Sequence, residues 1–416
     1  MKDIRIIRFT DIAALFTIAI FLVLTFILLD HVEYQGFNPS DDGVVLAQSW
    51  RIINGEAPHK DFISIRPVGS GVLHSIHFYT GLPLMVSARW FVLLQFFVIG
   101  VLFSLIIREL YFQEYKKVLS PILFYSLVLT GFGLSALNYN MYPWTTIDAV
   151  FWSVFAMFFL IRRKPYFLII GLVLLSFAAL SRQNFAILTL LGFVYVLFFS
   201  KGKFLQRFLI CIFGGIPFIL YFLILLKSDA VNLFVEQMTG RTELFETGIL
   251  QFGKRFFLSF SASINVICLF ICALLFFGKK SALKEVFVSK GFASLIAVVY
   301  GFIAIVLIVR YYLLDYADIL GLPFELFYML AVLGLLNFIV SGKIRLIHNY
   351  TLIVLLIGWT SAISLGDNSP VFSTGIIALM LLFVIADFHI LYPVKITGVV
   401  SNKYFLAVLS IIIFVL

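Results

Sequence analysis

The sequence has few charged residues for its length. Lys, Arg, Asp and Glu together make up 12% of the 416 residues, whereas 62% are hydrophobic and the mean hydropathy is +1.09. A water-soluble domain carries about twice this share of charge. The composition therefore excludes an ordinary soluble protein and predicts an integral membrane protein, whose apolar side chains face lipid as well as one another.

Cysteine is almost absent. Cys211, Cys268 and Cys272 all fall inside apolar runs, so we expect them to pack within helices and neither to form disulfide bonds nor to bind metal. No His-Glu-x-x-His zinc motif occurs, and His74 and His77, one turn apart, have no third ligand near them in the sequence. We interpret the two histidines as polar residues at the membrane interface.

A nucleotide-binding loop is also excluded. The glycines of Pro67–Gly71 are not followed by a Lys-Ser or Lys-Thr pair and do not follow a strand-like run, both of which a phosphate loop of that class requires. The formal net charge of +9 does not indicate nucleic acid, because the cations are distributed as the positive-inside rule demands.

Long apolar runs account for most of the chain. A run of about 20 such residues spans a bilayer, and the first, at 11–29, is too long for a cleavable signal and is expected to remain as an anchor. Further runs predict an all-α polytopic fold of 12–13 transmembrane helices, forming a single domain over residues 1–416. They lie at 86–107, 118–137, 147–161, 165–181, 185–199, 208–226, 256–277, 292–309, 319–340, 350–365, 372–391 and 404–416.

The basic residues set the orientation. Lys2, Arg5 and Arg8 precede the first span and place the N-terminus in the cytoplasm. If the spans alternate, the later basic clusters also fall on the inner side, which leaves 30–83 and 227–255 as external loops. The last run has only 13 residues, so we expect the sequence to be truncated at its C-terminus.

The first external loop contains most of the polar sequence. Ser40 is a predicted cap for a helix that begins at Asp41 and Asp42 and stops at Asn54-Gly55. Leu46, Trp50 and Ile53 recur at helical spacing, which predicts an amphipathic helix along the outer membrane surface. The helix dipole favours ionised carboxylates at Asp41 and Asp42, which therefore serve either as helix caps or as a general base or metal ligands.

Three motifs in this loop carry a family resemblance. They are Asp42-Gly43, the pattern Asn-Gly-Glu-x-Pro-x-x-Asp-Phe at Asn54–Phe62, and Arg66-Pro-x-Gly-Ser-Gly, followed by a helix that opens with Ala88-Arg89. The loop resembles the first external loop of GT-C membrane glycosyltransferases. It is most similar to the group that uses polyprenyl-phosphate sugars and includes protein O-mannosyltransferases and lipid A aminoarabinose transferases.

The resemblance implies a reaction and its site. An inverting GT-C enzyme moves a sugar from a polyprenyl phosphate to a hydroxyl group of a glycan, lipid or protein acceptor, outside the plasma membrane (the inner membrane of a bacterium). The resemblance places the general base at Asp41 or Asp42, and we add Asp61 as a third catalytic candidate. Whether a divalent cation, Mg²⁺ or Mn²⁺, takes part is left open; Asp41 and Asp42 are its predicted ligands.

The departing phosphate requires positive charge, and the sugar requires polar and aromatic surfaces. Each of the cationic and aromatic residues named below has an alternative role, which is to anchor a helix end at the membrane interface. The predicted phosphate-binding residues are Arg66, Arg89, Arg182, Lys254, Arg255 and Arg310, and the predicted substrate-binding residues are Tyr139, Tyr142, Gln183 and Tyr311.

Two other functions are compatible with a polytopic chain. A transporter or flippase places ionisable residues near the membrane midplane, whereas this chain keeps nearly all its charges at the ends of spans. A polysaccharide polymerase or ligase with a pyrophosphate-linked donor usually has its large external loop later in the chain. Both comparisons favour the transferase.

Overall fold

The computed structural model describes residues 20, 23, 42–136, 141–239, 243–277, 290–311, 321–363 and 369–391. Among them are sixteen α-helices and no strand, which confirms the predicted all-α class. The chain divides into two compact units. Unit 1 comprises Met1–Ile20, Phe103–Asn138 and Gly248–Leu416, and unit 2 comprises Phe21–Leu102 and Tyr139–Thr247.

The helices are those of a membrane protein. In the described part of the chain, three are long and apolar enough to cross a bilayer: α4 (Leu84–Tyr115), α16 (Gly321–Ser341) and the segment Val371–Phe388. The number rises to five if two bent pairs each form one span, Phe204–Gly214 with Ile216–Lys227 (50°) and Phe252–Leu258 with Ala262–Phe276 (105°). The other apolar helices are shorter, so the count of 12–13 spans stays a prediction.

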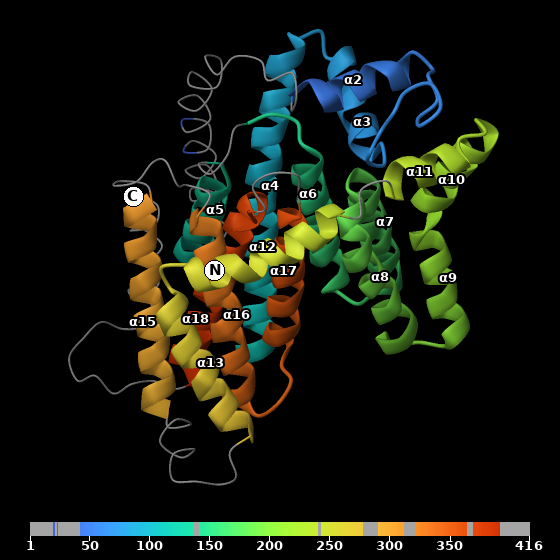
Figure 1. The fold of residues 1–416 in the computed structure, drawn as a ribbon. Coiled ribbons are helices and arrows are strands. Elements are labelled where there is room, and N and C mark those ends of the chain that lie inside the picture. Colours follow the sequence, from blue (N-terminus) through green and yellow to red (C-terminus); the bar gives the residue numbers. More distant parts are fainter. Residues whose placement is uncertain are drawn as a thin grey trace, which may run out of the picture. The chain divides into compact units, whose positions relative to one another are not determined.

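Unit 2 contains the described part of the predicted first external loop. Its α6 and α7 lie side by side, and α7 also packs against α8, α9 and the short helix α3 (Figure 1). Besides the first part of α4, its helices are α2 (Asp42–Ile53), α3 (Gly69–His74), η1 (Ser75–Tyr79), α6 (Thr145–Leu160), α7 (Pro165–Ser181), η2 (Gln183–Phe185), α8 (Ala186–Val194), η3 (Tyr195–Phe199), α9 (Phe204–Gly214), α10 (Ile216–Lys227) and α11 (Val231–Thr239).

The predicted helix of the first loop is present as α2. It ends where expected, because Gly55 takes a φ of +84°, a left-handed conformation that glycine adopts without strain. Of the predicted apolar stripe, Leu46 is buried in the protein and Trp50 is 54% exposed, and the placement of the stripe on the membrane surface stays a prediction. The helix packs against α3 and η1, and its Val45 and Ser49 are fully buried.

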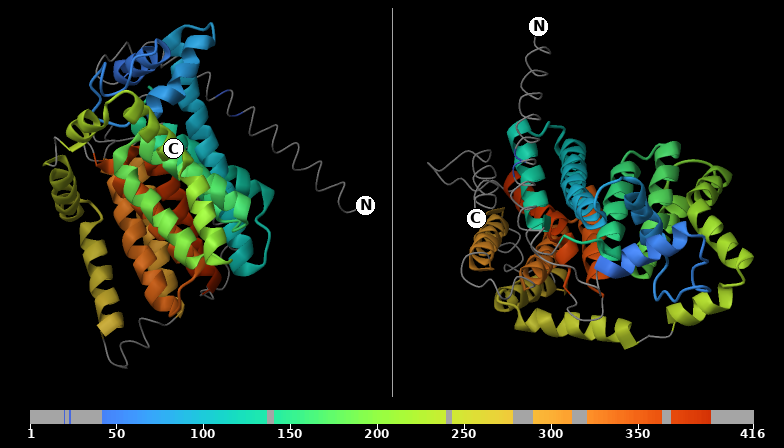
Figure 2. Two further views of the ribbon diagram at one scale, coloured as in Figure 1. Left: turned by 90° about the vertical axis from the view of Figure 1, so that its right-hand side faces the viewer. Right: turned by 90° about the horizontal axis from the view of Figure 1, so that it is seen from above.

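Unit 1 is a bundle around α18. This helix packs against α5, α15, α16 and α17 (Figure 2). The apolar window Val371–Phe388, which includes most of α18, is buried throughout. A Cβ on Gly375 would lie 2.2 Å from the carbonyl oxygen of Gly131, so the two backbones approach closely. Besides the second part of α4, the unit contains α5 (Pro121–Ala136), most of α12 (Glu243–Leu258), α13 (Ala262–Phe277), α15 (Lys290–Val309), α16, α17 (Leu346–Ala362), η6 (Val371–Ser373) and α18 (Thr374–Leu391).

A buried carboxylate stabilises the sharp bend before α13. Glu325 of α16 accepts hydrogen bonds from the amides of Phe260 (2.5 Å) and Ser261 (3.0 Å) and from the Ser261 hydroxyl (2.5 Å). These amides precede the first turn of α13, where intrahelical acceptors are lacking. Glu325 thus caps α13 from a neighbouring helix and has a structural role.

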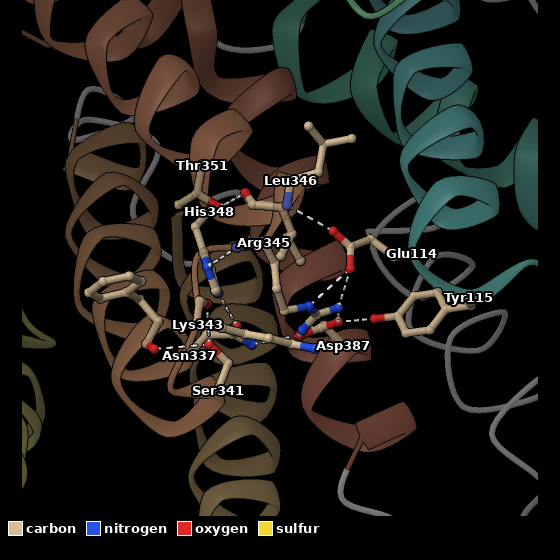
Figure 3. Close-up of polar contacts among 12 residues, drawn as sticks. Glu114, Tyr115, Asn337, Ser341, Lys343, Arg345, Leu346, His348, Thr351 and Asp387 are labelled. Atoms are coloured by element: carbon tan, nitrogen blue, oxygen red, sulfur yellow. Dashed lines mark hydrogen bonds and ion pairs between the residues drawn. The ribbon is translucent and has the colours of Figure 1, made fainter. Parts of the chain in front are cut away.

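A second buried cluster joins the ends of four helices in unit 1 (Figure 3). Arg345, which precedes α17, donates from both terminal nitrogens to Asp387 of α18 at 2.7 and 2.8 Å and from Nε to Glu114 of α4 at 3.0 Å. Asn337 of α16 and Tyr115 of α4 also donate to Asp387. Every charge in this cluster faces an opposite charge or a hydrogen-bond donor, and we assign it to the stability of the bundle.

Candidate functional site

Two arginines of unit 2 converge on the first residues of α6. Trp144 is extended and α6 begins at Thr145. Arg66 donates from Nη1 to the Thr145 hydroxyl at 2.9 Å, and Arg182 donates from Nη1 to the adjacent hydroxyl of Thr146. The loop before α3 and the turn after α7 thus place their guanidinium groups at the same helix N-terminus.

Two guanidinium groups bring positive charge to the first turn of α6, which also contains the buried Asp148. Burial, and after it the charge of Arg66, lowers the pKa of the Arg182 guanidinium, although arginine remains protonated in proteins. The N-terminus of α6 adds the positive end of a helix dipole. Two guanidinium groups and a helix N-terminus are the components of a phosphate site, because all three present N–H donors and positive charge.

Close backbone packing holds the two arginines together. A Cβ on Gly69 would lie 2.7 Å from the carbonyl carbon and oxygen of Leu180, so α3 rests directly on the end of α7. Gln183 Nε2 donates to the carbonyl oxygen of Ile65 at 3.2 Å, which links the residue after Arg182 to the residue before Arg66.

Three buried polar atoms of this part of unit 2 lack a partner among the described residues. Ser70 Oγ, Ser181 Oγ and Gln183 Oε1 are buried, and none has a hydrogen-bond partner within the part of the chain that the structure describes. Buried polar groups are normally paired. Two hydroxyls and an amide oxygen next to two arginines are suited to a polar ligand.

Aromatic side chains cover Arg66. Its guanidinium lies 4.9 Å from the centre of the Trp144 ring, and the Tyr142 ring meets that of Trp144 edge-on at 5.9 Å. Tyr142, a predicted substrate-binding residue, is only 5% exposed. Its ring contact with Trp144 connects it to Arg66.

A buried chain of polar side chains ends on the same helix. His74 Nε2 lies 3.2 Å from both carboxylate oxygens of Asp148, and His74 Nδ1 lies 2.9 Å from His77 Nε2. His77 Nδ1 in turn lies 2.9 Å from Ser87 Oγ, and Gln95 Nε2 donates to Asp148 at 2.7 Å. Burial, and after it the charge of His74, lowers the pKa of His77 to about 4, so this imidazole is neutral at pH 7.

The predicted acidic residues are only partly covered by the structure. Asp41 lies outside the described residues, and Asp42 is the first residue of α2, its side chain also outside them. Asp61 is exposed; its carboxylate accepts a hydrogen bond from the Ala57 amide at 2.6 Å and faces an open groove that also includes Lys60. None of its recorded bonds reaches the arginine pair.

The other predicted residues divide between the two units. In unit 2, Arg89 is 8% exposed in the first turns of α4, and Tyr139 lies outside the described residues. Four other predicted residues belong to unit 1: Lys254, Arg255, Arg310 and Tyr311. There, Arg255 lies over the Phe324 ring at 4.9 Å, and Arg310 lies over the rings of Phe260 and Tyr311 at 5.2 and 5.7 Å. The structure thus brings together Arg66, Arg182, Gln183 and, through Trp144, Tyr142.

No resident metal centre is visible in the described part of the chain. There, no group of three or more His, Cys, Asp or Glu side chains is placed to hold an ion. His74 and His77 direct ring nitrogens at each other at hydrogen-bonding distance, which leaves no room for an ion between those atoms. The proposed metal ligands Asp41 and Asp42 lie outside the described side chains and stay a prediction.

The sequence interpretation missed Asp148 and its partners. Asp148 lies inside the apolar run 147–161, and an ionisable residue in such a run is itself a functional signal. The hydroxyls of Thr145 and Thr146 carry no comparable signal, because they become ligands of arginine only when α6 is placed beside α3 and α7. His74 and His77 were interpreted as interfacial residues, but both are buried.

Comparisons with protein-family models, curated proteins and solved structures found no significant match. The functional conclusion therefore rests on the sequence motifs and on the geometry of unit 2.

Proposed function

We propose that the protein is a GT-C-type glycosyltransferase that moves a sugar from a polyprenyl phosphate to an acceptor hydroxyl on the outer face of the plasma membrane. The observation that carries this proposal is the convergence of Arg66 and Arg182 on adjacent threonines at the N-terminus of α6. A lipid phosphate lies at the depth of the membrane surface, and these two residues flank predicted outer ends of spans.

The arginines would act on the leaving group. As the bond between the anomeric carbon and the phosphate oxygen breaks, negative charge grows on the phosphate. The fixed N–H groups of the arginines stabilise this larger charge more strongly than the charge of the intact polyprenyl-phosphate sugar. Direct displacement by the acceptor oxygen inverts the anomeric carbon, as the resemblance implies. The same resemblance assigns the general base to Asp41 or Asp42; of these, Asp42 is the first residue of α2, in the unit that contains the arginines.

The finer topology belongs to the same proposal. Twelve to thirteen spans with a cytoplasmic N-terminus put α2, α3, the start of α6 and the turn at Arg182 outside the membrane. The inner position of Arg162 and Arg163 supports this orientation, because these basic residues lie at the opposite end of α6 from Thr145.

The test is release of polyprenyl phosphate from a labelled polyprenyl-phosphate sugar by the purified full-length protein. Asp41→Asn, Asp42→Asn, Arg66→Gln and Arg182→Gln are compared with wild type. Arg162→Gln is the matched control, since Arg162 is an exposed arginine that lies over the Phe158 ring at the other end of α6. We expect wild type and the control to turn over and both Arg66→Gln and Arg182→Gln to lose at least tenfold in kcat/KM. Full activity of both would contradict the phosphate site.

One observation favours the transporter as the second candidate. Asp148 and His74 are fully buried ionisable residues, and such residues mark ion paths in transporters. If no donor is turned over, but wild-type protein moves lipid or solute across liposomes and Asp148→Asn does not, the assignment changes to transport.

A further inference from the structure

The backbone of Arg66 is held by a buried serine. Ser64, which is 2% exposed, donates from its hydroxyl to the Arg66 carbonyl oxygen at 2.6 Å, and Gln48 of α2 donates to the same hydroxyl at 2.9 Å. The main-chain amide of Ser64 donates to Oε1 of Gln237 in α11 at 3.0 Å. Ser64 therefore connects the arginine site to a helix that lies 173 residues further along the chain.

The orientation of the Gln237 amide is fixed by backbone groups. Its Oε1 faces the N–H group of Ser64, and its Nε2 lies 2.9 Å from the carbonyl oxygen of His59, which can only accept a hydrogen bond. The reversed amide would place two donors together at Ser64 and two acceptors together at His59. Gln237 thus joins both ends of the segment 59–64 and determines where this segment lies.

A tight turn links α10 to α11. Asp229 takes a φ of +55°, and its amide donates to the carbonyl oxygen of Leu226 at 3.1 Å, as in a Schellman motif at a helix end. The structure describes α11 in full, and none of its residues is buried. The ring of Phe234 meets the His59 ring edge-on at 5.0 Å, and Gln237 alone makes three hydrogen bonds between α11 and the loop.

We propose that Gln237 is a positioning residue for the donor phosphate, because it holds Arg66 in place through Ser64. The proposal rests on the proposed transferase function, in which Arg66 stabilises the departing phosphate. It gives the predicted second external loop, which contains α11, a part in the donor site. A group that stabilises a transition state must be held within about 0.5 Å of its productive position. Loss of Gln237 therefore slows transfer by displacing the arginine.

The competing interpretation is that Gln237 only stabilises the fold. The two interpretations differ in how the effects of Gln237 and Arg66 combine. If Gln237 acts through Arg66, its removal has no further effect once the arginine is replaced. If it only stabilises the fold, its effect adds to that of the arginine, because independent effects on free energy are additive.

The experiment measures donor release by full-length wild type, Gln237→Met, Arg66→Gln and the double variant. Gln206→Met is the matched control, since Gln206 is an exposed glutamine of α9 in the same unit. We expect Gln237→Met to lower kcat/KM for the donor about fivefold and to leave the acceptor KM unchanged. The double variant should equal Arg66→Gln, and Gln206→Met should equal wild type.

Hydrogen exchange adds a readout that does not depend on turnover. Because the Ser64 amide donates to Gln237, exchange of residues 60–66 at pH 7 should accelerate in Gln237→Met and not in Gln206→Met. Thermal unfolding shows whether each variant is folded. Wild-type kcat/KM or unchanged exchange in Gln237→Met, its failure to fold, or an additive loss in the double variant would overturn the positioning role and leave the transferase intact. No turnover by wild type would overturn both.

Discussion

Arg345 places both terminal nitrogens of its guanidinium on the carboxylate of Asp387, at 2.7 and 2.8 Å. The two side chains are 7% and 0% exposed, so neither charge has access to bulk water. This fork-to-fork contact defines the geometry of the cluster at the ends of α4, α16, α17 and α18.

Removal of one partner should destabilise the bundle strongly. We expect Arg345→Met to lower the free energy of unfolding by about 3–5 kcal/mol, because Asp387 and Glu114 are left as buried charges without their cation. The exposed pair Arg51 and Glu56, 3.2 Å apart, is the matched control; Arg51→Met should cost about 1 kcal/mol or less. Chemical unfolding in detergent measures both, and equal losses would show that Arg345 is not the anchor of the cluster.

The sequence was sufficient for the fold class and for one end of the site. Apolar runs predict helices because backbone N–H and C=O groups inside a bilayer can only pair with one another. The predicted end of the first-loop helix at Asn54-Gly55 was confirmed, because this stop signal is local to the sequence. Arg66 and Arg182 could be named as candidates because cations next to span ends are visible in the sequence, and Gln183 because it follows Arg182; the structure brings the three together, and their roles as ligands stay a prediction.

The remaining features depend on packing between distant segments. His74 and Asp148 are 74 residues apart in the sequence, and Arg345 and Asp387 are 42 residues apart. No local sequence pattern predicts that either pair is in contact. Periodicity predicts the apolar stripe of α2 but not that this helix packs against α3 and η1. The sequence next to each arginine also does not show that Arg255 and Arg310 belong to unit 1 whereas the other predicted phosphate-binding arginines belong to unit 2.

A single methyl group on Gly69 should disturb the arginine site. In Gly69→Ala the new Cβ would meet the backbone of Leu180 at 2.7 Å, so α3 must move away from α7. Because Arg66 precedes α3 and Arg182 follows α7, we expect the donor KM to rise severalfold. Gly133→Ala in α5, where nothing lies within 4 Å of the added Cβ, is the control and should leave the donor KM unchanged. An unchanged KM in Gly69→Ala would show that α3 does not position Arg66.

Arg182 should not be replaceable by lysine. Its guanidinium already donates to Thr146, and a planar fork can hold that hydroxyl and an anion together, whereas an ammonium group is a single point of charge. Loss of one charge-assisted hydrogen bond costs about 1.5–3 kcal/mol, so Arg182→Lys should lower kcat/KM for the donor by about tenfold or more. The matched control, Arg162→Lys, changes the same groups on an exposed arginine and should have no effect. Wild-type kcat/KM in Arg182→Lys would exclude a role for the fork geometry.

Acid should release the loop that precedes Arg66, through His59. This buried histidine lies 2.7 Å from the Tyr221 hydroxyl through Nε2 and 2.9 Å from Gln237 Oε1 through Nδ1, so it joins the first loop to α10 and α11. Gln237 Oε1 also accepts the Ser64 amide, which makes it an acceptor and requires the proton of neutral His59 to be on Nδ1. Burial, the largest influence, lowers the pKa of His59 from its usual 6.5.

A folded-state pKa below the unfolded value fixes the sign of the pH effect. The contribution of neutral His59 is fully present above pH 6.5 and is lost as the pH falls below that value, by at most about 1.4 kcal/mol per pH unit for one proton. Hydrogen exchange of residues 56–66, corrected for the intrinsic rate, should therefore accelerate between pH 7 and pH 5. His59→Leu should remove this pH dependence, and an acid response of the loop that persists in His59→Leu would show that another group controls it.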